Sequence, residues 1–137
     1  MNTKKIADAI GAKIKATMVD IAANPNLVSL DDFDLVGFGS GIATGERYPN
    51  MLKFVEKLPN VQNKKAFIFS TSGTYKEKKM QKDHKALRDI LQKKGFEIVN
   101  EFSCKGFYYL GFKFFGFNKK HPNNEDIKNA ELFAEKL

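Results

Sequence analysis

The sequence predicts an α/β fold, a three-layer sandwich in which helices cover both faces of a parallel sheet. Two segments carry the prediction, Asp34–Ile42 and Lys65–Thr74, because each is an apolar run that ends in small and hydroxyl residues. Runs without polar alternation are typical of strands buried on both faces. Helical periodicity lies between these strands and after them, and this alternation favours parallel pairing through right-handed crossovers.

The length and composition indicate a soluble protein. The 137 residues fit one domain, residues 1–137, and the hydrophobic content of 42% is ordinary. The chain has no apolar run near the roughly 20 residues that a membrane span needs and no signal-peptide pattern, so we expect a cytoplasmic protein without membrane contact. One cysteine, Cys104, and two histidines argue against a thiolate zinc site, and we expect no metal.

The chain is basic, with a formal net charge of +7. Such a balance attracts nucleic acid or an acidic protein through the summed surface field. The basic residues are mostly scattered, however, with local clusters at Lys76, Lys78, Lys79 and Lys82 and at Lys119 and Lys120. We therefore favour a solvated surface over a polyanion site, and we do not expect nucleic acid as the partner.

The first third of the chain predicts a helix and a strand. Asn2 or Thr3 can cap a helix over Thr3–Lys13, which carries an apolar stripe of isoleucines at every fourth residue. The segment Ala16–Ile21 is a strand candidate on its apolar content, and the turn-prone Asn24-Pro25-Asn26 follows it.

The middle of the chain predicts two helices and another strand. Pro49 suits the first turn of a helix that ends at Pro59-Asn60. A second helix runs up to Gly95, and His84 lies on its apolar stripe, which suggests a partly buried structural residue. Phe96–Phe102 is a strand, and Cys104 near its end is expected to be packed rather than reactive.

The last part of the chain combines an aromatic segment with a helix. Phe107–Phe117 is rich in aromatic residues, and we interpret it as a long loop that packs its rings over the sheet edge. The alternatives are a surface that flanks a flavin or docks a protein. Asn123 or Asn124 then caps the final helix, and His121 before Pro122 is expected to be a solvated loop residue.

Two loops at strand ends predict a binding crevice. Ligands of open α/β sheets lie beyond the carboxyl ends of the strands, where Ser40 to Tyr48 and Ser70 to Tyr75 would meet. The serines and threonines of the second loop are alternatively simple turn formers. Ile42 occupies the position where a dinucleotide-binding fingerprint needs its third glycine, which argues against a Rossmann NAD site. Ser40 lacks the flanking glycines of a nucleophile elbow, which argues against a catalytic serine.

Several segments together resemble the flavodoxin-like superfamily, specifically a short flavodoxin-domain family. They are Asp34–Ile42, Leu52–Pro59, Lys64–Gly73, Lys94–Ile98, Phe102–Gly106 and His121–Asp126. The resemblance runs from Asn2 to the end of the chain. Together these segments are far more specific than any one of them.

The resemblance implies a five-stranded parallel sheet in the order 2-1-3-4-5, with non-covalently bound FMN at its carboxyl edge as a one- or two-electron carrier. The protein would then be an electron carrier rather than a substrate-converting enzyme, and its redox partner protein is not identified by the sequence. The implied cofactor-binding residues are Asn2, Thr3, Ser40, Gly41, Ile42, Tyr48, Ser70, Thr71, Ser72, Gly73 and Thr74. The alternative is a cofactor-free flavodoxin-like relict or protein-interaction module.

One departure from the family pattern concerns the start of the chain. Family members begin with an apolar strand and a phosphate loop of the type Ser/Thr-x-Thr-Gly-Asn-Thr, of which only Asn2 and Thr3 match. The fold is therefore expected to be N-terminally truncated, with its first strand absent, which argues against tight FMN binding. We expect one of three compensations: Ala16–Ile21 moves in beside Asp34–Ile42, two chains form a homodimer, or the natural chain begins upstream of Met1.

Overall fold

The computed structural model describes residues 2–23, 29–42, 49–73, 77–106, 108–109, 116–117 and 121–137. Its elements in chain order are α1 (Asn2–Ile14), β1 (Leu35–Ile42), α2 (Pro49–Glu56), β2 (Lys64–Ser72), α3 (Glu77–Lys93), β3 (Phe96–Lys105), β4 (Tyr108–Tyr109), β5 (Gly116–Phe117) and α4 (Asn124–Glu135). The predicted helices and the strands around residues 38, 68 and 99 are confirmed. The last of these strands runs on to Lys105, beyond the predicted end at Phe102.

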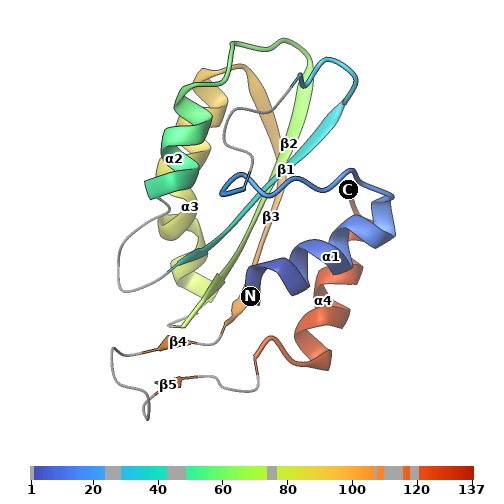
Figure 1. Ribbon diagram of the computed structural model, residues 1–137, viewed down its shortest axis with the longest axis vertical. Coiled ribbons are helices and arrows are strands. Elements are labelled where there is room, and N and C mark those ends of the chain that lie inside the picture. Colours follow the sequence, from blue (N-terminus) through green and yellow to red (C-terminus); the bar gives the residue numbers. More distant parts are fainter. Residues whose placement is uncertain are drawn as a thin grey trace.

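The sheet confirms the predicted α/β class. Strands β1, β2 and β3 pair in that order, and both pairings are parallel. Figure 1 shows α1 and α4 on one face of this sheet and α2 and α3 on the other, which gives three layers. The five-stranded sheet is not found among the described residues, in which β4 and β5 form a separate antiparallel pair and no strand lies along the outer edge of β1.

Strand β2 is buried on both faces, as its unbroken apolar run predicted. Ala66 and Ile68 belong to the core beneath α2 and α3, whereas Phe67 and Phe69 belong to the core beneath α1 and α4. This alternation continues beyond the apolar run. Ser70 therefore faces α3, and the next residue, Thr71, faces α1.

Two glycines of β1 leave room for aromatic rings of the neighbouring strand. A Cβ atom at Gly37 would lie 2.2 Å from Cζ of Phe67, and one at Gly39 would lie 2.0 Å from Cζ of Phe69. The two rings therefore lie across the backbone of β1, and they stack with centroids 5.9 Å apart. Gly37 and Gly39 serve this packing rather than a ligand.

Replacing Gly39 by alanine is expected to lower the free energy of unfolding by about 1 to 3 kcal/mol, because the new methyl group overpacks the buried Phe69 ring. Urea unfolding measures the loss. Gly41→Ala is the matched control on the same strand, since the nearest atom to its Cβ would be the Thr3 hydroxyl at 3.2 Å. Equal losses in the two variants would contradict this packing role.

The predicted strand at Ala16–Ile21 is wrong. The segment has no regular structure, and Met18 and Val19 are 50% and 40% exposed. Met18 lies over Gly11 of α1, where a Cβ atom would be 2.6 Å from its sulfur, whereas Ile21 packs against the core beneath α2 and α3. The segment thus passes from one face of the sheet to the other, and it does not fill the place beside β1.

The C-terminal helix begins with a complete capping box. The Asn123 side chain accepts a hydrogen bond from the Asp126 backbone, and the Asp126 carboxylate accepts one from the Asn123 N–H. His121 is not the solvated residue that we expected, because its Nδ1 contacts the same carboxylate and its side chain is 25% exposed. Apart from β4 and β5, the residues of the aromatic segment lie outside the described residues.

Candidate functional site

The carboxyl ends of β1 and β2 lie side by side, as the predicted crevice requires. Ser40 pairs with Ser70, Gly41 with Thr71, and Ile42 with Ser72 in the parallel register. Strand β3 ends at the same edge, where Lys105 pairs with Ser72. The two loops predicted to form the crevice therefore start from adjacent strands at one edge of the sheet.

Helix α1 begins at this edge. The Thr3 and Thr71 hydroxyl oxygens are 2.8 Å apart and share a hydrogen bond, which ties the first turn of α1 to β2. Gly41 faces the same point, because a Cβ atom there would lie 3.2 Å from the Thr3 hydroxyl and 3.7 Å from that of Thr71. The N-terminus of α1 therefore lies close to two hydroxyl groups, those of Thr3 and Thr71, and to the backbone of Gly41, which has no side chain.

The remaining predicted site residues divide by the side of the sheet that they face. Asn2 opens α1 beside Thr3, whereas Ile42 is 7% exposed and belongs to the core beneath α2 and α3. Ser70 and Ser72 are buried, and Gly73 follows them at the end of the described part of this loop. Tyr48 and Thr74 lie outside the described residues, so their roles stay predictions.

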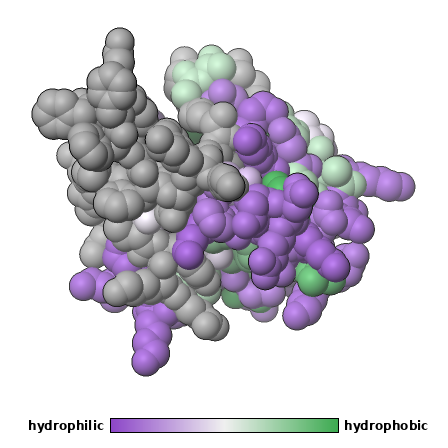
Figure 2. All heavy atoms as spheres, turned by 90° about the horizontal axis from the view of Figure 1, so that it is seen from below, coloured by the Kyte–Doolittle hydropathy of each residue, from purple (hydrophilic) through white to green (hydrophobic). Residues whose placement is uncertain are grey.

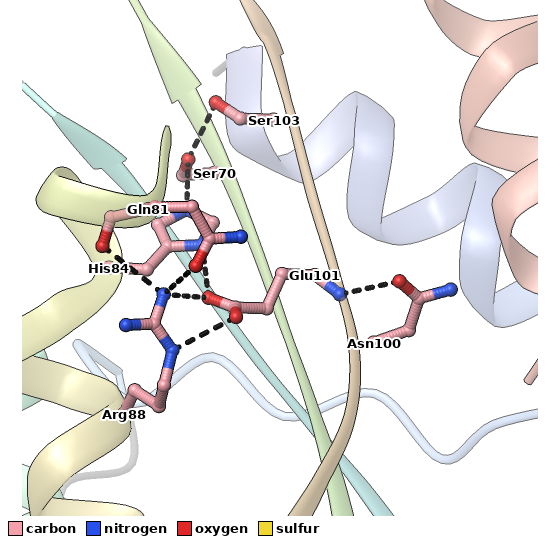
Figure 3. Close-up of polar contacts among 7 residues, drawn as sticks. All are labelled: Ser70, Gln81, His84, Arg88, Asn100, Glu101 and Ser103. Atoms are coloured by element: carbon pink, nitrogen blue, oxygen red, sulfur yellow. Dashed lines mark hydrogen bonds and ion pairs between the residues drawn. The ribbon is translucent and has the colours of Figure 1, made fainter. Parts of the chain in front are cut away.

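A buried polar network begins directly beneath this edge. Ser70 Oγ lies 2.8 Å from His84 Nε2 and donates to Ser103 Oγ at 2.8 Å. The other ring nitrogen of His84, Nδ1, is 2.9 Å from Oε1 of Glu101. As Figure 3 shows, the chain of contacts runs from β2 through α3 to β3. The network therefore links three elements at the carboxyl half of the sheet.

Arg88 completes the network at its more exposed end. Its Nε donates to Glu101 Oε2 at 2.9 Å and its terminal nitrogen to Oε1 at 2.8 Å, which is a bidentate ion pair. The same terminal nitrogen donates to the side-chain oxygen of Gln81 at 2.9 Å. Burial acts to raise the pKa of Glu101, but the hydrogen bonds from His84 and Arg88 and the charge of Arg88 outweigh it and hold the pKa below its ordinary value.

A serine, a histidine and a carboxylate in this order are the arrangement of a nucleophilic triad. Burial argues against that activity here, since both Ser70 and His84 are 0% exposed. The Ser70 hydroxyl also donates its proton to Ser103 rather than to a reacting group. The network therefore acts as a structural clamp that fixes the end of β2 against α3 and β3.

Glu101 and Ser103 were not predicted from the sequence, because a bulge changes the alternation of β3. The register with β2 shifts between Ala66 and Phe67, and Val99 is the extra residue. Before the bulge Phe96 and Ile98 face α3, and after it Glu101 and Ser103 do so. One signal was available: His84 on an apolar stripe needs a polar partner once it is buried.

The lowered pKa of Glu101 predicts an acid-dependent loss of stability. A carboxylate with a lower pKa in the folded state stabilises the protein fully above its unfolded pKa of about 4.3, and this stabilisation is lost as the pH falls through the folded pKa. We therefore expect the stability difference between the wild type and Glu101→Gln to be largest near neutral pH and to shrink below about pH 4. Urea unfolding across this range measures it. A difference that stays constant with pH would contradict the assignment.

A family model described as a flavodoxin domain matches residues 2–106. The chain belongs to this family. An uncharacterized protein of Methanocaldococcus jannaschii is similar to this flavodoxin-domain protein, with 47% identity over 139 residues that cover 99% of this chain and 89% of the relative.

Solved structures show the same fold for this flavodoxin-domain protein. Oxidised flavodoxin 1 from Bacillus cereus matches with a TM-score of 0.68 at 22% identity, covering 98% of this chain and 88% of that one. A flavodoxin from Streptococcus pneumoniae matches with a TM-score of 0.62 at 21% identity, covering 99% and 89%. In the described part of the chain, no helix has the length and apolar character to cross a membrane.

Proposed function

We propose that this flavodoxin-domain protein binds FMN at the carboxyl edge of its sheet and serves as an electron-transfer protein. The observation that carries the proposal is the meeting of Thr3, Thr71 and Gly41 at the N-terminus of α1. Hydroxyl donors beside the first N–H groups of a helix suit an anionic oxygen. Membership of the flavodoxin family supports the choice of FMN over other anionic ligands.

The residues at this edge fit a flat, anionic cofactor. Thr3, Thr71 and the N-terminus of α1 would hold its phosphate-bearing side, and the absence of a side chain at Gly41 keeps this point accessible. The main chain of Ser70 to Gly73 would face the ring, and the clamp on Ser70 keeps that strand end fixed. Bound FMN supplies one- or two-electron chemistry, so these residues need only bind, orient and shield it.

Spectroscopy of the purified protein tests the proposal. A yellow protein with a flavin spectrum, or quenching of added FMN fluorescence on titration, is the expected result. Gly41→Val is expected to weaken FMN binding by about tenfold or more, because its side chain fills the space beside Thr3 and Thr71. Thermal unfolding of the variant checks that it folds. A colourless protein that leaves FMN fluorescence unchanged would instead support a cofactor-free interaction module.

A further inference from the structure

Exposed lysines surround the carboxyl edge of the sheet. Lys4 and Lys5 lie in the first turn of α1, Lys78 and Lys82 in the first half of α3, and Lys105 at the end of β3. All five side chains are exposed. We call these residues the lysine rim. Figure 2 views the molecule from this side, and hydrophilic residues cover much of the described surface there.

Few described carboxylates offset the lysine rim. Asp8 pairs with Lys4, and Asp83 is buried beside Lys79, which is not part of the rim. Glu77 opens α3 beside Lys78, and Glu125 is exposed in the first turn of α4, whereas the neighbouring Asp126 is held in the capping box. The described part of this edge therefore has an excess of positive charge.

In the described part of the chain, the opposite edge of the sheet has no such excess. Exposed acidic and basic residues are interspersed there, at the ends of the helices and the starts of the strands. They include Asp31, Asp32, Asp34, Glu56, Glu97, Lys57, Lys65 and Lys93. Among the described residues, positive charge is thus more concentrated at the carboxyl edge of the sheet than at the opposite edge.

The lysines of α1 are placed against the preference of the helix itself. A helix N-terminus carries partial positive charge and is stabilised by acidic side chains, but the first turn of α1 has none and contains Lys4 and Lys5. Lys4 forms an ion pair with Asp8 one turn further along the helix, whereas no such pair offsets the unfavourable position of Lys5 among the described contacts. Both lysines add to the positive potential at the edge where the backbone N–H groups of α1 already point.

We propose that the lysine rim is a docking surface for an acidic patch on a protein partner. The proposal rests on the proposed function, because an electron carrier must bring the edge that holds its cofactor close to another protein. Opposite charges across such a contact speed the encounter and orient the two proteins. Nucleic acid is the alternative polyanionic partner, and comparing a DNA duplex with an acidic polypeptide distinguishes the two.

Charge reversal at each edge gives a matched test. The rim variant Lys78→Glu/Lys82→Glu/Lys105→Glu and the control Lys57→Glu/Lys65→Glu/Lys93→Glu have the same net charge, and all six lysines are exposed. Binding of fluorescent poly-L-glutamate, followed by anisotropy at about 20 mM salt, is expected to weaken about tenfold in the rim variant and less than about twofold in the control. Wild-type binding should fall steeply toward about 150 mM salt, as screening increases.

Two results would overturn the proposal. Equal weakening in both variants would show that net charge alone attracts the probe. Tighter binding of a DNA duplex than of poly-L-glutamate, lost in the rim variant, would assign the surface to nucleic acid. The probe needs no flavin, so FMN titration of the same proteins tests the proposed function separately. Circular dichroism confirms that both variants fold.

Discussion

Replacing Glu101 by alanine is expected to lower the free energy of unfolding by about 3 to 5 kcal/mol, because it leaves Arg88 and His84 without their shared acceptor. The His84 side chain is fully buried in the wild type, so the variant removes a hydrogen-bond partner from a buried polar group. Chemical denaturation of the wild type and the variant at neutral pH measures the loss.

Glu97→Ala is the matched control for this prediction. Glu97 lies on the same strand, before the bulge, and its side chain is exposed. Its replacement is expected to change the free energy of unfolding by no more than about 0.5 kcal/mol. Similar small losses in the two variants would show that the clamp does not contribute to stability.

Replacing Gly95 by alanine is expected to lower the free energy of unfolding by about 2 to 5 kcal/mol. Gly95 follows α3 with a φ of +103°, a conformation that strains any residue with a Cβ atom. The Cβ would also lie 2.0 Å from the backbone oxygen of Val61. This oxygen cannot move freely, because the Val61 N–H donates to the Lys94 oxygen at 2.8 Å.

Gly95→Asn separates strain from steric overlap. Asparagine tolerates positive φ better than alanine does, but it brings the same Cβ atom toward Val61. If overlap dominates, as the 2.0 Å approach indicates, both variants lose similar stability in thermal or urea unfolding. A well-tolerated Gly95→Asn would contradict this account.

The sequence predicted those parts of the fold that local pattern determines. The apolar runs of β1 and β2, the proline at the start of α2 and the cap at Asn123 each have a local physical cause, and the structure confirms these elements. Burial on both faces is confirmed for β2 only, because β1 lies at the edge of the described sheet and is partly exposed. The parallel pairing of β1 with β2 was predicted from the alternation of strands and helices along the chain. The edge that brings Ser40 beside Ser70 was therefore predictable.

The errors arose where distant contacts decide the structure. Ala16–Ile21 has the residues of a strand, but Met18 packs on α1 and Ile21 on the opposite core, which outweighs local preference. Glu101 could not be assigned to the face of His84 from alternation, since the bulge at Val99 depends on pairing with β2. The contact between Thr3 and Thr71 likewise exists only because α1 packs across the sheet.

The packing of Cys104 has a practical consequence. As predicted, this cysteine is buried, and burial followed by the nearby charge of Asp126 raises the pKa of its thiol to about 12. Since Cys104 belongs to the core beneath α1 and α4, a thiol reagent can reach it only when that layer opens. The rate at which Cys104 is alkylated therefore measures how often this layer opens. A cysteine introduced at the surface would also accept a spectroscopic label without competition from Cys104.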